Sequence, residues 1–223
     1  MVDGVTGTAA PQGLGDRRRG VLGTEHEALH RTEDRRGGQA DDEQSVDRAD
    51  GFWARALALK PTYMLIGFGG NDVPGMGPER ETDPNTTFYA NMKQYVEEAR
   101  AAGIRPILVT PMELRKYDKD GKLMHSYDDY AAATRKVGED THTPVIDLYK
   151  RSTAFLETLT QAQADTLNHI DPTQPKVIDR GHINRTGSEI IGGFVAEDLK
   201  TAVPALAKSI RVQPNGPVVA PSR

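Results

Sequence analysis

The chain has 223 residues, 27% of them charged, and a net charge of −4, which suits one α/β domain and gives no reason to expect a nucleic-acid or membrane partner. The absence of cysteine excludes a disulfide scaffold, a thiolate nucleophile and a cysteine-ligated zinc. The sequence has neither the ~20-residue apolar run of a membrane span nor the apolar stretch of a signal peptide, so we expect a soluble protein and leave its compartment open.

Residues 1–50 differ in composition from the rest of the chain. They contain seven Arg but no Lys and no aromatic residue, and their clustered charges follow no helical or strand period. Such a segment has too little apolar surface to offset the entropy of ordering. We interpret it as disordered or non-native, for example read from a shifted frame of a GC-rich gene. It would precede a domain over 51–210 and a flexible tail over 211–223.

From residue 51 onward, apolar spacing predicts alternating helices and strands. In chain order these are a short helix over 52–59, a buried strand over 62–68, a helix over 83–102, a strand over 105–110, a loop or hairpin over 112–125, a helix over 127–140, a short strand over 144–148, a helix over 149–159 and a helix over 187–200. Asp83 is the expected N-cap of the second helix, with Pro84 at its first position and Gly103 as its stop.

Two of these helices have a clear apolar face that should pack inward. In the helix over 83–102 this face comprises Phe88, Met92, Tyr95, Val96 and Ala99. In the helix over 187–200 it comprises Ile190, Ile191, Phe194, Val195 and Leu199. The alternation of strands with such helices predicts an α/β fold, in which helices cover both faces of a parallel sheet.

Polar side chains follow the expected strands where a parallel sheet binds its ligands. Asn71 comes after a Gly-Gly turn at the end of the first strand, and Thr110 ends the second. Asp179 and His182 fall in an expected loop before the last helix. Because ligands bind beyond the carboxyl ends of parallel strands, all of these residues could share one rim.

The residue types on this rim are those of acyl transfer. Asp179, three residues before His182, could fix the tautomer of an imidazole base, and the Asn71 amide could hold an oxyanion. Each motif alone also fits a structural role, because Asp179 could cap a turn and Asn is a common turn former. Their combination in these places favours the functional interpretation.

Two blocks of the sequence, Phe68-Gly69-Gly70-Asn71-Asp72 and Asp179-Arg180-Gly181-His182-Ile183-Asn184, resemble those of the SGNH (GDSL-type) hydrolase superfamily. The segments over 77–84 and 108–111 are similar to its rhamnogalacturonan acetylesterase-like branch, whose members are often secreted bacterial enzymes. The resemblance extends over about 51–199. It implies a flavodoxin-like three-layer α/β/α sandwich and hydrolysis of acetyl or short acyl esters, often on carbohydrate, without metal or other cofactor.

The resemblance also implies individual roles. Asn71 would be an oxyanion donor, His182 the general base and then acid, and Asp179 its orienting partner. Asp72 would either line the cleft mouth with the loop over 74–84 or stabilise its turn. The nucleophilic serine of the family, in a Gly-Asp-Ser block after a first strand, is not recognisable here, so the nucleophile is unknown. Thr6 and Ser45 are weak candidates.

Two other interpretations of the function stay open. A chain without the nucleophile could be a catalytically inactive protein on the same scaffold that binds carbohydrate or another partner. A metal-dependent hydrolase could use some of the six histidines, of which His26 and His30 are spaced i,i+4. That pair lacks the Glu of a zincin motif, and the Gly-rich turn after the first strand lacks the Lys-Ser/Thr pair of a phosphate loop.

Overall fold

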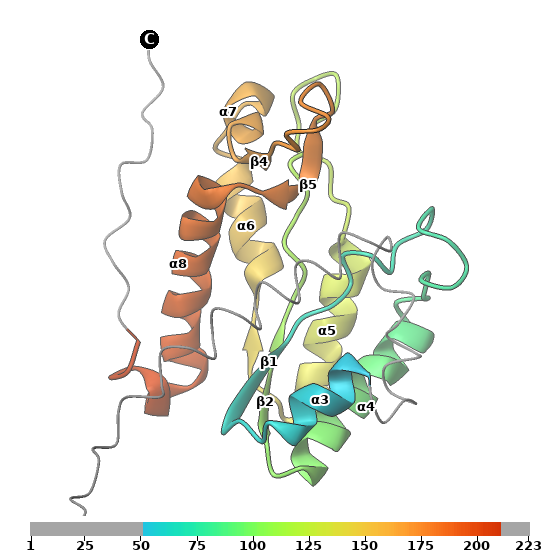
Figure 1. The fold of residues 1–223 in the computed structure, drawn as a ribbon, viewed down its shortest axis with the longest axis vertical. Helices are drawn as coiled ribbons and strands as arrows, with labels where there is room; N and C mark the ends of the chain where they lie inside the picture. Colours follow the sequence, from blue (N-terminus) through green and yellow to red (C-terminus); the bar gives the residue numbers. More distant parts are fainter. Residues whose placement is uncertain (1–50, 211–223) are drawn as a thin grey trace, which may run out of the picture. The chain divides into compact units, whose positions relative to one another are not determined.

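The computed structural model describes residues 51–210; the segments over 1–50 and 211–223, with the candidates Thr6 and Ser45, lie outside the described residues (Figure 1). The described elements are α3 (Phe52–Ala58), β1 (Tyr63–Ile66), α4 (Thr87–Ala101), β2 (Arg105–Val109), α5 (Asp128–Thr141), β3 (Val145–Ile146), α6 (Leu148–Leu156), α7 (Gln161–Asp165), β4 (Asn168–His169), β5 (Asp179–Ile183), α8 (Arg185–Ala202) and a 3-10 turn, η1 (Pro204–Leu206).

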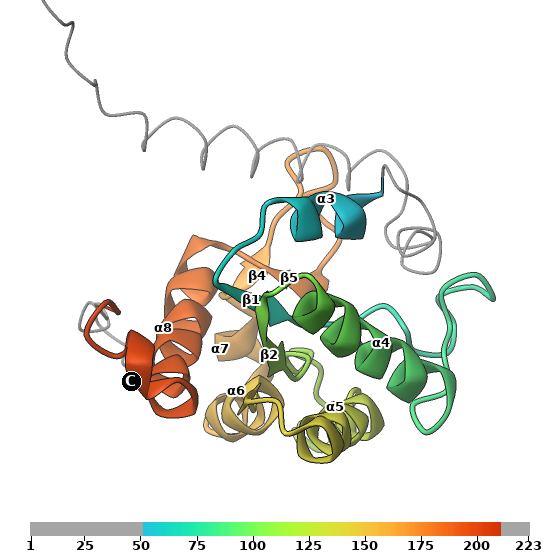
Figure 2. The same cartoon turned by 90° about the horizontal axis from the view of Figure 1, so that it is seen from below.

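Strands β1, β2 and β3 form a parallel sheet in that order. Ile66 pairs with Leu108 at one junction, and Val109 pairs with Ile146 at the other. Helices α4 and α5 cover one face of the sheet, and α6 and α8 cover the other (Figure 2). The described region therefore has the predicted layers, helix on sheet on helix, and its strands all point their carboxyl ends the same way.

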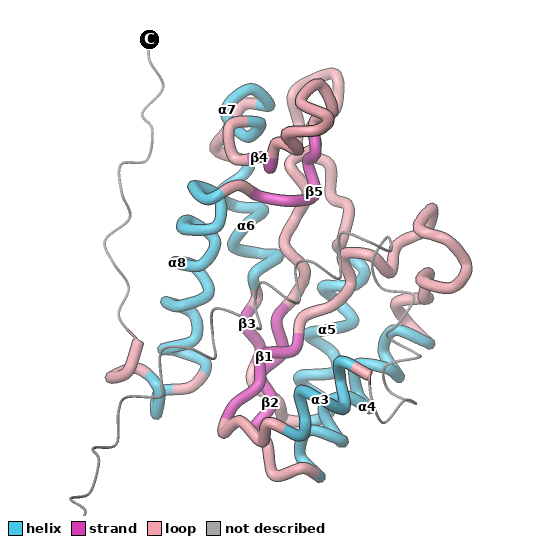
Figure 3. Tube along the Cα trace, viewed as in Figure 1, coloured by secondary structure: helices cyan, strands magenta, loops and turns pink. Residues whose placement is uncertain are grey.

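A separate two-stranded antiparallel sheet, β4–β5, lies beyond the carboxyl ends of the parallel strands (Figure 3). The prediction of a loop over Asp179–His182 is therefore wrong, since these residues belong to β5. The reason is a partner segment that the sequence pattern did not reveal. Asn168 pairs with Ile183, and the Asn184 N–H donates to the Leu167 carbonyl at 2.9 Å.

Helix α4 begins later than predicted. Asp83 is not its N-cap, because the helix starts at Thr87. The Asp83 carboxylate instead accepts hydrogen bonds from the Asn85 N–H at 2.9 Å and the Thr86 hydroxyl at 3.0 Å, and so organises a turn just before the helix. The predicted stop at Gly103 fits its backbone, which has φ 78°, a value that favours glycine.

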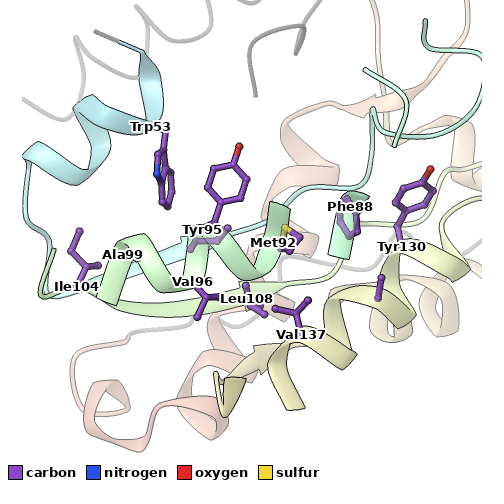
Figure 4. Close-up of a cluster of buried hydrophobic side chains, with 12 residues drawn as sticks. Trp53, Phe88, Met92, Tyr95, Val96, Ala99, Ile104, Leu108, Tyr130 and Val137 are labelled. Atoms are coloured by element: carbon purple, nitrogen blue, oxygen red, sulfur yellow. The ribbon is translucent and has the colours of Figure 1, made fainter. Parts of the chain in front are cut away.

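The main hydrophobic core lies between α4 and the sheet (Figure 4). The predicted apolar face of α4 is confirmed, since its members are at most 3% exposed: Phe88, Met92, Tyr95, Val96 and Ala99. They pack against Ile66 and Leu108 from the sheet, Trp53 from α3, and Tyr130 and Val137 from α5. This core fixes the end of β1, from which the turn carrying Asn71 departs.

The other face of the sheet is less covered than predicted. Leu65, in the middle of the strand expected to be buried, is 45% exposed. The predicted inward face of α8 is only half-buried, at Ile190, Ile191, Phe194, Val195 and Leu199. Within the described residues β1 is an edge strand, and α8 packs mainly against β3, β5, α6 and η1. The spacing of apolar residues therefore predicts the correct inward face of α8, but the side chains on that face are less buried than predicted.

Candidate active site

Asp179 and His182 form a hydrogen-bonded pair within β5. The His182 Nδ1 lies 2.8 Å from the Asp179 Oδ2. An ionised carboxylate can only accept, so Nδ1 carries the proton in this pair and Nε2 keeps its lone pair when the ring is neutral. The His182 side chain is 84% exposed and that of Asp179 only 32%. The arrangement can therefore present an oriented base to a molecule arriving from solvent.

The charge on Asp179 is stabilised by its own strand. Burial opposes ionisation, but three donors outweigh it: the His182 N–H at 3.0 Å, the His182 ring and the Gly181 N–H at 2.9 Å. Together they lower the pKa of Asp179 below its ordinary value. Asp179 is thus ionised at neutral pH and can stabilise a positive charge that develops on the imidazole.

The turn that carries Asn71 is packed tightly after β1. Gly69 has φ 104°, and a Cβ there would lie 3.0 Å from the Tyr130 Cβ and 3.3 Å from the Pro111 Cγ, so only glycine fits without strain. Asn71 itself is half-buried. Pro111 follows β2, so the Asn71 turn and the segment after β2 lie side by side.

Asp72 supports the loop that follows this turn. Its carboxylate accepts from the Gly69 N–H at 2.9 Å and the Thr82 hydroxyl at 3.3 Å. The Tyr130 hydroxyl joins the same two segments, because it lies 2.7 Å from the carbonyl oxygens of both Asp72 and Thr82 and can donate its one proton to either. Burial raises the pKa of Asp72 above its ordinary value. These contacts match the turn-stabilising role; lining of a cleft by Asp72 stays a prediction.

Thr110 has a structural role at the end of β2. It is 1% exposed, donates to Asp147 at 3.1 Å and accepts the Tyr149 N–H at 2.8 Å. Asp147 in turn binds Arg135 at 2.9 Å and caps α6. Thr110 therefore joins the end of β2 to the start of α6.

The segment that follows β1 and strand β5 both lie beyond the carboxyl ends of the parallel strands (Figure 1), and they carry Asn71 and the Asp179–His182 pair. The segment after β2 connects them: Pro111 packs beside the Asn71 turn, and the Arg115 guanidinium donates to the His182 carbonyl at 2.6 Å. Sequence reasoning missed Arg115, because an arginine in an expected loop shows no sign of being buried. The one available signal is its position five residues after the end of a strand.

In the part of the chain that the structure describes, no group of three or more His, Cys, Asp or Glu side chains could hold a metal ion. The i,i+4 pair His26 and His30 lies outside the described residues. Over the same described part, no helix is long and apolar enough to cross a membrane.

Comparison with known proteins settles the family. Residues 4–190 match the GDSL-like Lipase/Acylhydrolase family, which is more than half of the chain. The chain belongs to this family. The match begins inside the segment of unusual composition over 1–50. It confirms the resemblance to SGNH hydrolases that the Asn71 and His182 blocks indicate.

Two curated proteins of Bacillus subtilis (strain 168) are similar to this chain in sequence. The probable rhamnogalacturonan acetylesterase YesY is 28% identical over 148 residues, 66% of this chain and 66% of YesY. The rhamnogalacturonan acetylesterase RhgT is 28% identical over 144 residues, 62% of this chain and 60% of RhgT. The matched part of the chain therefore spans slightly less than two thirds of each relative.

A solved structure shares the fold. That of Axe2, an acetylxylan esterase from Geobacillus stearothermophilus, matches with a TM-score of 0.53 at 21% identity, over 73% of this chain and 68% of Axe2. At this identity the likeness concerns the fold alone. It confirms the predicted three-layer α/β/α sandwich with its parallel sheet.

Proposed function

We propose that the chain is an esterase that removes acetyl or other short acyl groups from carbohydrate. The observation that carries this proposal is the Asp179–His182 hydrogen bond of 2.8 Å, with the His182 ring open to solvent. Membership of the acylhydrolase family and likeness to two proteins named rhamnogalacturonan acetylesterases support this substrate class.

The proposed mechanism is a serine-type acyl-enzyme pathway. A protein hydroxyl attacks the ester carbonyl while His182 Nε2 takes its proton, and the Asn71 amide donates to the oxyanion. The tetrahedral intermediate collapses, and His182 returns the proton to the departing sugar oxygen. Water, deprotonated by the same Nε2, then releases the acid and restores the hydroxyl. The hydroxyl is not identified; Thr6 and Ser45 are the first two to substitute.

Asp179 has the supporting role in this pathway. Its hydrogen bond holds Nδ1–H in place and leaves Nε2 as the base, and its negative charge stabilises the imidazolium formed at each step. The donors within β5 keep Asp179 ionised, so it need not gain or lose a proton during turnover.

The test is hydrolysis of p-nitrophenyl acetate and of acetylated rhamnogalacturonan by the purified chain. We expect His182→Ala to lower turnover by roughly 10⁴-fold or more and Asn71→Ala by about 10²–10³-fold. His142→Asn is the matched control, because His142 is exposed at the C-cap of α5 and its left-handed backbone tolerates Asn. Hydrolysis that survives both site substitutions would place the chemistry elsewhere.

The alternative is a catalytically inactive carbohydrate-binding or interaction protein. The absence of a recognisable Gly-Asp-Ser block favours it. A folded wild-type chain that hydrolyses neither ester but binds acetylated oligosaccharide in calorimetry would support this alternative.

A further inference from the structure

A network of charged and amide side chains lies next to the candidate active site. Its centre is Arg115, which is 1% exposed. The Arg115 Nε donates to the Asn168 Oδ1, and its Nη2 donates to the His182 carbonyl at 2.6 Å. Burial lowers the pKa of Arg115 below its ordinary value, and this effect outweighs the opposing attraction of Asp179 and Asp165.

A second arginine continues the network outward. Arg180 binds both carboxylate oxygens of Asp165, at 3.0 and 3.1 Å. Asp165 also accepts from the Asn168 amide at 2.9 Å and the Gln161 amide at 2.7 Å. The Gln161 amide also donates to the Arg115 carbonyl at 3.1 Å, and so connects Asp165 back to Arg115. Helix α7, strands β4 and β5 and the segment after β2 are thus joined by polar contacts.

The pairing of β4 and β5 beside this network is irregular. His169 pairs with Asp179 and Asn168 with Ile183, so two consecutive residues of β4 face residues of β5 that are four apart. The intervening residues of β5 form a bulge without ladder partners in β4. Bulges redirect side chains and occur often beside active sites, and the bulge contains His182.

Arg115 supplies the hydrogen bonds that β4 does not. Its backbone N–H lies 3.4 Å from the Arg180 carbonyl, and its guanidinium binds the His182 carbonyl. Two carbonyls of the bulge are thereby held by one residue, and Asn168 holds that residue's guanidinium in place. Fixing the His182 carbonyl fixes the peptide plane from which the imidazole projects toward Asp179.

We propose that Arg115 is a positioning residue that holds the β5 bulge in the shape needed for Asp179 to bind His182 Nδ1. Its importance for catalysis rests on the proposed function, but its effect on the pair does not. Lysine cannot replace it: a guanidinium presents several donors in a rigid fork and reaches two acceptors at once, whereas an ammonium on a flexible stem does not.

The tautomer of neutral His182 is a direct measure of this positioning. Where Asp179 accepts from Nδ1, the proton stays on Nδ1, whereas a ring without that partner favours the Nε2–H form. Nitrogen-15 NMR distinguishes the two forms, and four of the six histidines lie in the described part. Loss of overall stability alone would not move this signal in a folded sample.

The variants are Arg115→Lys, which keeps the charge, and Asn168→Ala, which leaves Arg115 but removes its guanidinium partner. We expect the Nδ1–H fraction of His182 to fall to less than about half in both. Arg151→Lys is the matched control, because Arg151 binds Glu197 and Asp198 between α6 and α8, away from β5. It should leave the tautomer unchanged. If Arg115→Lys does not fold, Asn168→Ala carries the test.

The outcomes separate this inference from the proposed function. An unchanged His182 tautomer in folded Arg115→Lys or Asn168→Ala overturns the positioning role, even if the wild type hydrolyses esters. A wild type with the Nε2–H form overturns it as well. A tautomer shift in the two variants, combined with a wild type that hydrolyses no ester, upholds the role while the esterase proposal fails. In an active wild type, we expect Arg115→Lys to lower kcat about 10²-fold with KM nearly unchanged.

Discussion

The core around α4 and the small β4–β5 sheet are held together by different forces. The first consists of apolar side chains at most a few per cent exposed, packed between a parallel sheet and its helices. The second has two short strands and depends on Arg115, Asp165 and Asn168. A core of this kind sets stability, whereas a polar network sets direction and geometry. Substitutions in the two regions should therefore affect different measurements.

The largest expected effect comes from removing the charge of Asp179 without changing its shape. Asp179→Asn should lower kcat roughly 10⁴-fold, because an amide can stabilise the wrong imidazole tautomer and cannot balance an imidazolium. The urea midpoint should move little, since the Asn oxygen can still accept the N–H groups of Gly181 and His182. A variant that keeps wild-type turnover would show that this pair is not the catalytic one.

A substitution in the core should have the opposite effect: a large loss of stability and no loss of turnover. Met92 is 1% exposed in the centre of α4, so Met92→Ala should lower the free energy of unfolding by about 2–5 kcal/mol. Met124 is 49% exposed and serves as the matched control, with a change below about 0.5 kcal/mol. Urea denaturation measures both. Turnover per folded molecule should stay the same in Met92→Ala; a large loss there would mean that core packing also sets the site geometry.

The buried residues of the α4 core could be predicted from the sequence, because apolar side chains recur there with a helical period. A side chain every three or four residues identified the buried face of α4, and strand–helix alternation identified the layers. Exposure was harder to predict. Leu65 and the inner face of α8 are apolar enough to be buried, yet their exposure depends on which elements cover them, which a local period does not encode.

The contacts around the β4–β5 sheet could be predicted from the sequence only in part. The i,i+3 spacing of Asp179 and His182 indicated a pair, and the structure has the hydrogen bond. The bulge in β5 and the partners of Arg115 were not readable, because they join residues 53 and 67 positions apart. The capping box of α7 at Thr160 and Gln163, by contrast, is a local signal of a helix start within the sequence itself.

Helix α8 approaches the β4–β5 sheet closely at Gly187. A Cβ at Gly187 would lie 2.9 Å from the Ile183 Cβ and 3.0 Å from the Leu167 carbonyl. Alanine normally stabilises a helix by about 1 kcal/mol relative to glycine, but here the overlap should reverse the sign. Gly187→Ala should therefore destabilise the protein by about 1–2 kcal/mol and lower turnover, because it pushes α8 away from β5.

Gly192 in the same helix is the control for this effect. A Cβ there meets nothing within 4 Å, so Gly192→Ala should stabilise by up to about 1 kcal/mol and leave turnover unchanged. Thermal unfolding and ester hydrolysis, measured on both variants, separate the contact from helix propensity. Equal shifts in the two variants would mean that the Gly187 contact with β5 is not tight.

The smallest expected effect is a pair of opposite pH dependences. The pKa of Asp179 is lowered from its ordinary value of 3.8, so its stabilising contribution is present above that value and is lost as the pH falls through the depressed pKa. The pKa of Asp72 is raised by burial, so its contribution is present at low pH and is lost as the pH rises through the elevated pKa. Each contribution should be less than about 1 kcal/mol, because both groups are partly solvated.

Urea midpoints of Asp179→Asn and Asp72→Asn, compared with wild type from pH 3 to 7, should therefore diverge in opposite directions. Parallel curves would show that the hydrogen bonds within β5 do not outweigh the burial of Asp179.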